Sequence, residues 1–511
     1  MKTIDAHATV DTAATPADRP RIERRRRLSP AALAVANRKV GRAYSPAVIV
    51  GAVRIIDCLL LAAIGTALHL RFATSSDGFS LEPLASSLGM AGVAMLCFQA
   101  AGIYEIQTFR TPPWRVGRLI ASWALALLMF TGASFVVTRG GAVSLGWLES
   151  LFFAGLAALL ASRLALYALL GRWARQGRLD RRTIVVGADE AGAQLITALK
   201  AQHGSNIDVL GVFDDRHDSR IMESCAGVPR LGKVNDIVEF ARRTRVDLVV
   251  FALPISAESR ILQMLKKLWV LPVDIRLSAH NSKLRFHEGS YSYLGRVPTI
   301  DVFKPPITGW DLVMKWLFDN IVGGILLILA LPVMALVALA IKLDSPGPVL
   351  FRQKRFGFNN ERIDVFKFRS MYHDQADPAA SKVVTRNDPR VTRVGRFIRK
   401  TSLDELPQLI NVVVRGNLSL VGPRPHATQG KLQDRLFDEV VDGYFARHRI
   451  KPGITGWAQI NGWRGEVDTD EKIQKRVEFD LFYIENWSVL FDLEILLKTP
   501  LALIAKNENA Y

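Results

Sequence analysis

Two neighbouring carboxylates and an arginine held between prolines are the residues of this 511-residue chain best suited to chemistry. Asp404 and Glu405 stand where apolar residues at helical spacing predict the start of a helix, and Arg424 follows shortly after it. A carboxylate at a helix N-terminus stays ionised at neutral pH, so it can act as a nucleophile or as a ligand for Mg²⁺. A guanidinium on a backbone stiffened by Pro423 and Pro425 can grip a phosphate through two parallel hydrogen bonds.

The same acids also have a purely structural interpretation. Ser402 and Glu405 form the pattern of a capping box, and Asp404 in the first turn complements the helix dipole. Taken in isolation, this interpretation outweighs a catalytic one. The nearby Arg424 shifts the balance toward chemistry on a phosphate.

Two further cations precede the acids in the chain. The stretch from Phe351 to Met371 has the alternating character of a strand, which would bring Lys367 and Arg369 onto one face. A solvated strand face is the alternative interpretation of this pair.

Four separated motifs resemble the signature of the polyprenyl-phosphate sugar-1-phosphate transferases of bacterial exopolysaccharide and capsule synthesis. They are Ser345 to Gly357 (SPGPVLFRQKRFG), Phe366 to Met371 (FKFRSM), Asp388 to Pro425 and Lys451 to Gly462 (KPGITGWAQING). The resemblance is tight over the C-terminal part of the chain, and the upstream layout is similar to the long subgroup of the family. Asn417 stands where the family often has an acid, whereas the Asp-Glu pair is intact.

The resemblance implies a two-step exchange of a sugar phosphate. Asp404 would attack the β-phosphorus of a UDP-sugar, UMP would leave, and undecaprenyl phosphate would then take the sugar phosphate. Glu405 and Asp404 would hold Mg²⁺, and Arg424 would grip a phosphate, with Lys367 and Arg369 as weaker candidates for the same work. Glucose is the expected sugar, and galactose or another UDP-sugar is the alternative. The resemblance also implies a homodimer and contact with other exopolysaccharide assembly enzymes.

Composition indicates a membrane protein with soluble parts. Hydrophobic residues make up 49% of the chain and charged residues 22%, and the apolar residues are bunched into long runs. The formal net charge of +18 fits a membrane surface and a phosphate-rich substrate better than nucleic acid, because no nucleic-acid module is recognisable. The three scattered cysteines support neither a disulfide framework nor a metal site.

The chain divides into four expected parts. They are a disordered basic cytoplasmic tail (residues 1–46), a region of four transmembrane helices (47–172), a Rossmann-like α/β domain (180–290), and a small α/β catalytic domain with a re-entrant membrane helix (308–511). Lys and Arg are enriched in the tail, in the loop after the second apolar stretch and after the fourth. The positive-inside rule therefore places both ends of this region in the cytoplasm. We expect the protein in the inner membrane, with the catalytic domain on the cytoplasmic face. Arg54 and Asp57, one helical turn apart in the first stretch, are expected to pair with each other.

The glycine turn of the Rossmann-like domain departs from a dinucleotide-binding pattern. Gly187 and Gly192 are in place, but Asp189 occupies the position of the middle glycine, where it adds bulk and negative charge. The turn therefore predicts a degenerate nucleotide site and a structural or regulatory role, with dimerisation or another nucleotide left open.

A fifth apolar stretch, Ile321 to Leu343, is long enough to span a membrane. Pro332 near its middle and basic residues at both ends predict instead a re-entrant helix with a break, which enters and leaves on the cytoplasmic face. The apolar pattern from Val489 to Ile504 suggests a helix lying in the membrane interface, with core packing as the alternative. Trp457 and Trp463 fit a loop that stacks a base or meets the membrane.

Three other classes of protein share parts of this layout. A membrane-bound nucleotide-sugar dehydratase would need an intact glycine fingerprint and a Tyr-x-x-x-Lys pair, and none of the nine tyrosines has a lysine four residues later. A glycosyltransferase that moves only the sugar would release UDP and would need no aspartyl intermediate. An assembly scaffold would leave the spacing of Asp404, Glu405 and Arg424 unexplained.

Overall fold

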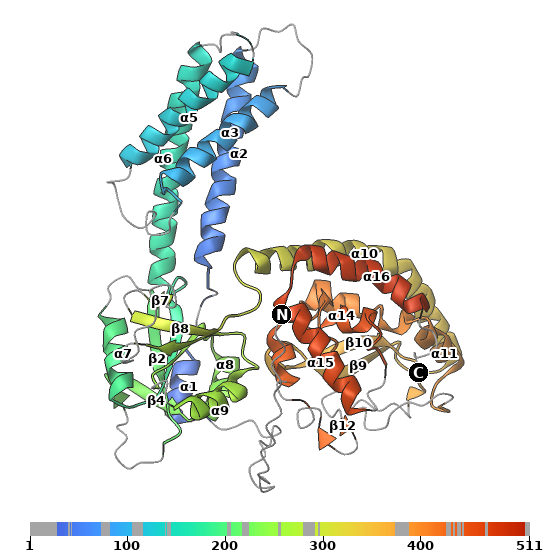
Figure 1. Ribbon diagram of the computed structural model, residues 1–511. Helices are drawn as coiled ribbons and strands as arrows, with labels where there is room; N and C mark the ends of the chain where they lie inside the picture. Colours follow the sequence, from blue (N-terminus) through green and yellow to red (C-terminus); the bar gives the residue numbers. More distant parts are fainter. Residues whose placement is uncertain are drawn as a thin grey trace, which may run out of the picture.

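The computed structural model shows a helical arm standing on an α/β sheet, with a second α/β region beside the sheet (Figure 1). It describes residues 28–38, 41, 43–72, 82–104, 116–137, 139, 145–201, 206–216, 224–253, 257–279, 292–294, 297–373, 388–425, 431–432, 435–436, 441, 444–465 and 469–505. The basic run at residues 24–27 lies outside these ranges.

The arm consists of long apolar helices that pack on one another. They are α2 (Pro46–Phe72), α3 (Glu82–Ala100), α5 (Val116–Val137) and α6 (Leu145–Arg175). Within the described residues, these four and α10 (Trp310–Asp344) are the helices long and apolar enough to cross a membrane. Trp123, Leu151 and Leu159 are fully buried at the centre of the bundle. The structure thus confirms several apolar helices ahead of the sheet.

The expected pair of Arg54 with Asp57 does not form. Asp57 is fully buried, and both its oxygens accept from the guanidinium of Arg163 on α6, at 3.1 and 2.6 Å. The hydroxyl of Tyr104 donates to the same carboxylate at 3.0 Å. Arg54 instead donates to Gln99 and lies over the Tyr104 ring, 5.0 Å from its centroid. The prediction was wrong because a guanidinium from a facing helix satisfies both carboxylate oxygens, which a neighbour on the same helix face does not.

An open sheet of predominantly parallel strands follows the arm. Its strand order is β3-β4-β2-β1-β5-β6-β8-β7. The strands are β1 (Arg181–Val186), β2 (Ile207–Phe213), β3 (Ser224–Cys225), β4 (Val228–Gly232), β5 (Leu248–Phe251), β6 (Asp274–Ser278), β7 (Ser292–Leu294) and β8 (Val297–Phe303). Strand β1 pairs in parallel with β2 and β5, whereas β8 runs antiparallel to β6. The β8 strand carries the sheet beyond the predicted boundary at residue 290.

Helices cover the sheet and include one that the sequence analysis placed in a disordered tail. Helices α7 (Glu190–Lys200), α8 (Ile237–Arg243) and α9 (Glu258–Leu268) come from within the domain. Helix α1 (Pro30–Ala36) packs Ala32 and Val35 into the same core, and the hydroxyl of Ser29 donates to the carbonyl of Leu231. The predicted tail, residues 1–46, is therefore ordered in this part, because α1 has an apolar face that the sheet domain buries.

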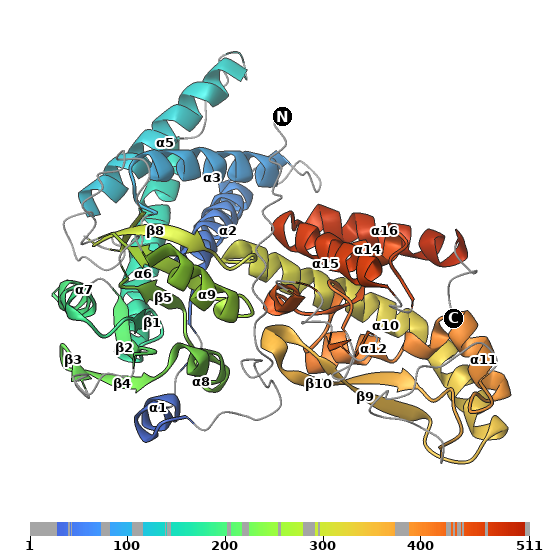
Figure 2. The ribbon, with the colours of Figure 1, turned by 60° about the horizontal axis from the view of Figure 1, so that its bottom comes forward.

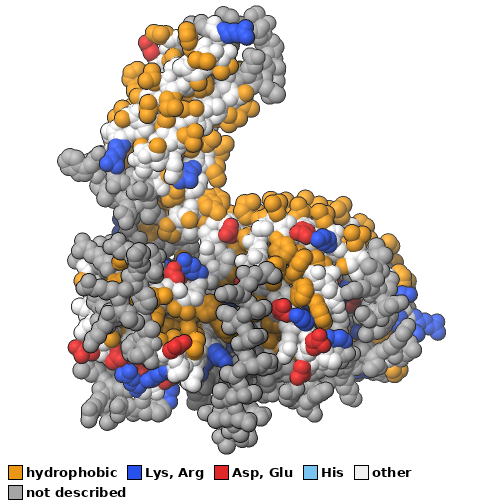
Figure 3. Space-filling model, viewed as in Figure 1, with side chains coloured by type: hydrophobic (Ala, Val, Ile, Leu, Met, Phe, Trp, Pro, Cys, Tyr) orange, Lys and Arg blue, Asp and Glu red, His pale blue; other side chains and the backbone are white. Residues whose placement is uncertain are grey.

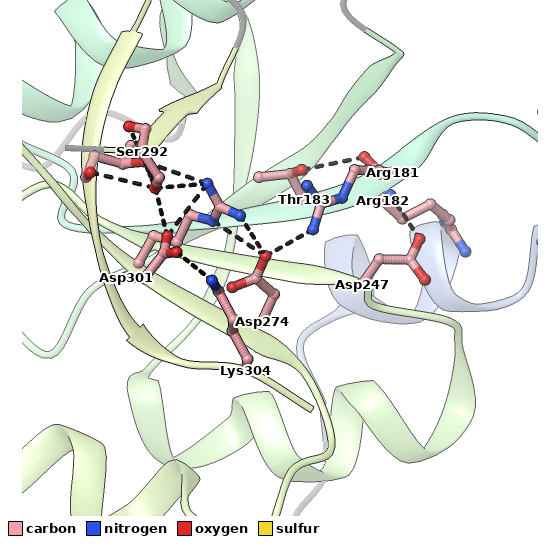
Figure 4. Close-up of polar contacts among 10 residues, drawn as sticks. Arg181, Arg182, Thr183, Asp247, Asp274, Ser292, Asp301 and Lys304 are labelled. Carbon is pink, nitrogen blue, oxygen red and sulfur yellow. Dashed lines mark hydrogen bonds and ion pairs between the residues drawn. The ribbon is translucent and has the colours of Figure 1, made fainter. Parts of the chain in front are cut away.

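A cluster of charged residues lies at the amino ends of the parallel strands (Figure 4). Asp274 accepts from Arg181 at 2.7 Å and from Arg276 at 2.9 Å. Arg276 also pairs with Asp301 at 3.3 Å, and Lys304 pairs with Asp301 at 2.8 Å. Nucleotides bind such sheets at the opposite, carboxyl edge. The cluster therefore joins β1, β6 and β8 as a structural element.

Helix α10 is a single continuous helix that contains Pro332. Figures 1 and 2 show it lying beside α16 (Val489–Ala505), and in Figure 1 it curves and runs crosswise to the arm. The break predicted at Pro332 is therefore wrong. A proline removes one backbone donor, and a helix that bends can continue past it.

Apolar side chains cover the outer face of α10 and α16 (Figure 3). On α16 the exposed leucines recur every three or four residues, which makes one stripe: Leu490, Leu493, Leu497 and Leu501. On α10 the most exposed include Ile328, Leu329, Leu336 and Leu343. Just ahead of α16, however, Tyr483 is fully buried and donates to Asp492 at 2.6 Å. The C-terminal helix thus combines a packed inner face with an apolar outer face.

Polar contacts under α10 fix the short strand that leads to Arg424. The Lys315 ammonium donates to Asp492 on α16 at 2.6 Å and to the carbonyl of Val421 at 2.9 Å. Asp319 accepts from the backbone amide of Leu420 at 3.1 Å. The strand β11 (Ser419–Val421) is therefore tied to both α10 and α16, which gives the residues after it a defined position.

Candidate active site

The two acids lie in a tight turn that follows the short helix α11 (Arg393–Lys400). The turn is the 3₁₀ segment η7 (Leu403–Glu405), and helix α12 (Gln408–Ile410) begins only after Pro407. Ser402 has a φ of +58°, in the left-handed region, and its side chain makes no capping hydrogen bond. The predicted capping box is thus wrong. The left-handed residue turns the chain so that the acids precede the helix, and the Ser402 hydroxyl accepts from Arg464 at 2.9 Å instead.

An asparagine joins the segment after the acids to a neighbouring strand. Asn411 begins the π-helical turn η8 (Asn411–Arg415), which continues α12. Its side-chain oxygen accepts from the amide of Phe366 at 2.9 Å, and its side-chain nitrogen donates to the carbonyl of Asp364 at 2.8 Å. Both residues belong to β10 (Arg362–Phe368), which pairs with β9 (Leu350–Phe356) as an antiparallel hairpin. The amide thereby sets the position of Lys367 relative to the acids.

Glu405 is surrounded by cations. One carboxylate oxygen accepts from Lys367 at 2.9 Å and from Arg424 at 2.7 Å, and the other lies 3.8 Å from Arg464. Burial alone would raise the pKa of Glu405, but the charges of these three residues outweigh it and hold the pKa well below its usual range. Glu405 is therefore an anion whose charge is fully compensated.

Asp404 has a different environment. Within the described parts of the chain, no hydrogen bond or ion pair reaches its carboxylate. Burial raises the pKa of Asp404 to about 6; Lys367 opposes the rise and the neighbouring Glu405 adds to it. Desolvation therefore raises this pKa, yet a carboxyl group with a pKa of about 6 is still mostly ionised at neutral pH, as the sequence analysis expects. An unbonded carboxylate beside a row of cations is well placed to attack an electrophile.

Two further arginines belong to the site and were missed by the sequence analysis. Arg464 contacts both Ser402 and Glu405, and it lies two residues beyond the last recognised motif. Burial, together with the charge of Arg424, lowers the pKa of Arg355 to about 10, and its guanidinium donates to the carbonyl of Pro425 at 3.4 Å. Arg355 lies in a recognised motif and Arg464 just after one, and nothing in those motifs marks either arginine as part of the site.

The second cation of the expected strand pair lies elsewhere. Arg369 follows the end of β10, is buried, and donates to the backbone carbonyls of Ser345 and Pro346. Its guanidinium therefore ties the end of α10 to β10, and the structure does not bring it to the acids. Of the predicted pair, Lys367 alone lies at the site.

The two acids fit a Mg²⁺ ion that arrives with a diphosphate. No cluster of three or more His, Cys, Asp or Glu side chains occurs in the described ranges. Mg²⁺ is commonly bound through one or two carboxylates together with substrate phosphates. Asp404 and Glu405 supply two carboxylates, and of the two only Asp404 has no direct cationic partner among the residues that the structure describes.

The two tryptophans that were expected to stack a base or meet the membrane make packing contacts. Trp457 begins the short helix α14 (Trp457–Ile460), and its ring lies 4.9 Å from that of Phe491. Trp463 lies 6.3 Å from the Phe479 ring. Both rings thus help to seat α16 and α15 (Asp470–Glu485) against the domain.

In the sheet domain, carboxylates accept hydrogen bonds from the backbone amides of the glycine turn. Asp189 caps α7 and accepts from the amide of Gly192 at 3.1 Å, and Asp214 accepts from the amide of Ala188 at 2.8 Å. Arg216 pairs with Asp189 at 3.3 Å. A phosphate would need these same amides at the helix N-terminus. The turn is therefore filled by side chains of the protein itself.

Two known families match different parts of this chain. The bacterial sugar transferase family matches residues 310–506, which include both acids and all the cations around them. A family described as a CoA-binding domain matches residues 99–279. CoA carries phosphates, and the occupied amides around Asp189 do not fit them.

Several characterised proteins are similar to the chain over most of its length. It is 39% identical over 328 residues to the UDP-glucose:undecaprenyl-phosphate glucose-1-phosphate transferase of Escherichia coli (strain K12), covering 64% of this chain and 68% of the relative. It is 36% identical over 417 residues to the Klebsiella pneumoniae protein of the same description, covering 80% and 87%. It is 30% identical over 365 residues to the undecaprenyl-phosphate galactose phosphotransferase of Salmonella typhimurium, covering 67% and 70%.

Proposed function

Because the chain belongs to the bacterial sugar transferase family, we propose that it transfers glucose-1-phosphate from UDP-glucose to undecaprenyl phosphate and releases UMP. The protein is thus a phosphotransferase that acts at the first membrane step of exopolysaccharide or capsule synthesis. Relatives named as glucose-1-phosphate transferases support glucose as the sugar, and a relative named for galactose supports the alternative.

The contrast between the two acids carries the mechanism. Asp404, which has no hydrogen-bond or ion-pair partner among the described residues, attacks the β-phosphorus of UDP-glucose. The bond from that phosphorus to the bridging oxygen breaks, and UMP leaves with that oxygen. An oxygen of undecaprenyl phosphate then attacks the same phosphorus. The bond to Asp404 breaks, the carboxylate is restored, and undecaprenyl-diphosphate-glucose is the product.

The cations serve both steps by compensating phosphate charge. Both reactants are anions that repel each other, and positively charged side chains held in fixed positions offset this repulsion. Arg424, Lys367 and Arg464 converge on Glu405, which holds them at one point of the site. Glu405 therefore orients the groups that bind the diphosphate.

Mg²⁺ remains part of the proposal. Asp404 and Glu405 would hold it together with the donor phosphates. When bound, it would neutralise charge on the diphosphate and so favour departure of UMP. Removal of divalent ions with EDTA should abolish transfer, and added Mg²⁺ should restore it.

The placement at the membrane is also proposed. The arm would cross the inner membrane four times, and α10 would enter and leave on the cytoplasmic face as a bent re-entrant helix. The apolar outer faces of α10 and α16, and the direction of α10 across that of the arm, support this placement (Figures 1 and 3). Undecaprenyl phosphate would then reach Asp404 from the bilayer.

The expected homodimer and the contacts with other exopolysaccharide assembly enzymes stay proposals drawn from the family resemblance. Mass measurement of the detergent-solubilised protein by light scattering distinguishes a dimer from a monomer. Affinity purification from a polysaccharide-producing cell identifies the partner enzymes.

Product analysis tests the function directly. The full-length protein in nanodiscs is mixed with undecaprenyl phosphate, Mg²⁺ and a panel of UDP-sugars, and the released nucleotide is identified. Release of UMP from UDP-glucose, with the corresponding lipid diphosphate sugar, is the expected result. Release of UDP would establish a glycosyltransferase that moves only the sugar. Absence of nucleotide from every donor would favour a scaffold.

A further inference from the structure

Three buried charged residues lie close together behind the site. Helix α15 carries Arg476 and Asp480 one turn apart, and the 3₁₀ segment η9 (Tyr444–Arg449) carries Arg447. Arg447 is 1% exposed and forms an ion pair with Asp480 at 2.6 Å. Asp480 also feels the charge of Arg476. We name Arg447, Arg476 and Asp480 the α15 anchor.

Arg447 of the α15 anchor contacts the backbone of a site residue. The guanidinium of Arg447 donates to the carbonyl oxygen of Arg424 at 2.7 Å. The side chain of Arg424 in turn donates to Glu405 at 2.7 Å. The peptide group from which the Arg424 side chain departs is therefore held from behind.

Arg476 of the α15 anchor holds the backbone beside Arg464 in the same manner. Arg476 donates to the carbonyl of Trp463 at 2.9 Å and to that of Gly465 at 3.0 Å. These residues flank Arg464, whose own guanidinium points to Ser402 and Glu405. One buried guanidinium thus bridges the backbone on both sides of Arg464.

From this geometry we infer that the α15 anchor is a positioning unit that sets the spacing between the Arg424 and Arg464 guanidinium groups for the diphosphate of the UDP-sugar. The inference rests on the proposed function, because it names the residues that prepare that same site for its donor. Arg447, Arg476 and Asp480 do not touch the substrate. They act through the backbone of the two residues that do.

Electrostatics explains why the anchor contains an acid. Two buried guanidinium groups repel each other, and burying charge is costly unless each charge is paired. Asp480 is ion-paired with Arg447 and is also attracted by the charge of Arg476. Both arginines are thereby held in one block, and the two loops that they hold keep a fixed separation. A pocket that must receive two linked phosphates benefits from such pre-organisation.

Kinetic measurements on conservative variants distinguish a role of the α15 anchor in positioning the site arginines from a role in the stability of the protein. Arg476→Lys keeps the charge beside Asp480 but cannot hold two separated carbonyls in the fork of a guanidinium. Asp480→Asn keeps the shape and removes the shared anion. The matched control is Lys475→Gln, the neighbouring residue on α15, whose exposed ammonium pairs with Glu478 at 2.9 Å.

The measurement uses the full-length protein in nanodiscs with UDP-glucose, undecaprenyl phosphate and Mg²⁺. We expect Arg476→Lys and Asp480→Asn to raise the KM for UDP-glucose about tenfold, the usual effect of losing one hydrogen bond to a charged group. The KM for undecaprenyl phosphate should stay close to that of Lys475→Gln. The melting temperature of Arg476→Lys should fall, because buried carbonyls lose a donor, so both KM values are measured at a temperature where the variant is folded. A merely structural role would lower the amount of active enzyme and leave both KM values unchanged, which would overturn the inference.

Failure of the proposed function gives a distinct result. If the wild-type protein releases no UMP, the affinity for UDP-glucose is measured directly by calorimetry in the same nanodiscs. Weaker binding by Arg476→Lys than by Lys475→Gln would still support the positioning unit. Equal binding by the two variants, or none by the wild type, would overturn it.

Discussion

Asp404 and Glu405 are adjacent in the chain. Of these two acids, only Glu405 forms ion pairs with described residues. Lys367 and Arg424 meet on one oxygen of Glu405 at 2.9 and 2.7 Å, whereas the Asp404 carboxylate lies beside these cations without contacting them. The two acids therefore differ in the task that each performs in the proposed transfer, apart from holding Mg²⁺. Glu405 gathers the cations, and Asp404 remains available to react.

Replacement of Asp404 by Asn should abolish transfer. An amide has no anionic oxygen with which to form the phosphoryl intermediate, so we expect kcat to fall at least about 10³-fold. Release of UMP from UDP-glucose measures this. Glu405→Gln is the matched comparison and should act mainly through the KM for UDP-glucose, since Glu405 orients the cations. Retained turnover in Asp404→Asn would exclude Asp404 as the nucleophile.

The same substitution should make the protein more stable at neutral pH. The pKa of Asp404 is raised to about 6 in the folded protein, so ionisation above that pH opposes folding. In metal-free buffer at pH 8, Asp404→Asn should increase the free energy of unfolding by about 1 to 3 kcal/mol, a range that discounts for partial exposure. The gain should shrink as pH falls from 6 to 4 and vanish below the pKa of the unfolded acid. Chemical unfolding at several pH values checks the slope, and a pH-independent gain would contradict it.

Arg424→Lys should lose most of the activity. Lysine can pair with Glu405, but it replaces a planar fork with a point charge and cannot make two parallel bonds to a phosphate. We expect kcat/KM for UDP-glucose to fall about 10²-fold, the usual effect of removing one preorganised donor. Steady-state kinetics with intact thermal stability would support the phosphate role, and unchanged kinetics would count against it.

Arg369→Lys should show the opposite pattern. Arg369 donates to the carbonyls of Ser345 and Pro346 and lies away from the acids. Loss of the guanidinium leaves buried carbonyls without a donor, so the free energy of unfolding should fall by about 1 to 3 kcal/mol. The KM for UDP-glucose should be unchanged at temperatures where the variant is folded. A selective rise in that KM would return Arg369 to the site.

The topology of α10 can be read by cysteine labelling. In a variant whose three native cysteines are replaced, Lys342→Cys near the exposed end of α10 should react with an impermeant reagent only from the cytoplasmic side. Arg139→Cys after α5 is the control and should react only from the periplasmic side. Periplasmic labelling at position 342 would show that α10 crosses the membrane.

The sheet domain should not respond to nucleotides. Asp189 and Asp214 already occupy the turn amides that a phosphate would need. NADH and CoA at millimolar concentration should therefore leave the melting temperature unchanged, whereas UDP-glucose should raise it through the catalytic region. A saturable shift with either nucleotide would show that the turn opens to admit it.

Much of the site could be predicted because its residues are close in sequence and arranged in motifs. The acids and Arg424 were named from a single stretch, and Lys367 was placed on a strand by alternation. Arg464 and Arg355 were missed, since nothing local distinguishes an arginine that faces an acid from one that faces water. Arg369 was assigned to the wrong place for the same reason. Asp57 was paired with its helical neighbour because its partner, Arg163, is remote in the chain.

Sequence alone determined the order of the parts, the apolar helices, the α/β alternation and the acids, because periodicity and motif spacing are local properties of a chain. Only the tertiary structure decided that α10 continues past Pro332 and that Ser402 turns rather than caps. It also decided that, in the part of the chain that the structure describes, Glu405 is ion-paired while Asp404 is not. Those outcomes depend on which residues, distant in the sequence, the fold brings close together in the protein interior, where the dielectric constant is low. Burial and pairing across the fold set the charge of each acid, and no local pattern records them.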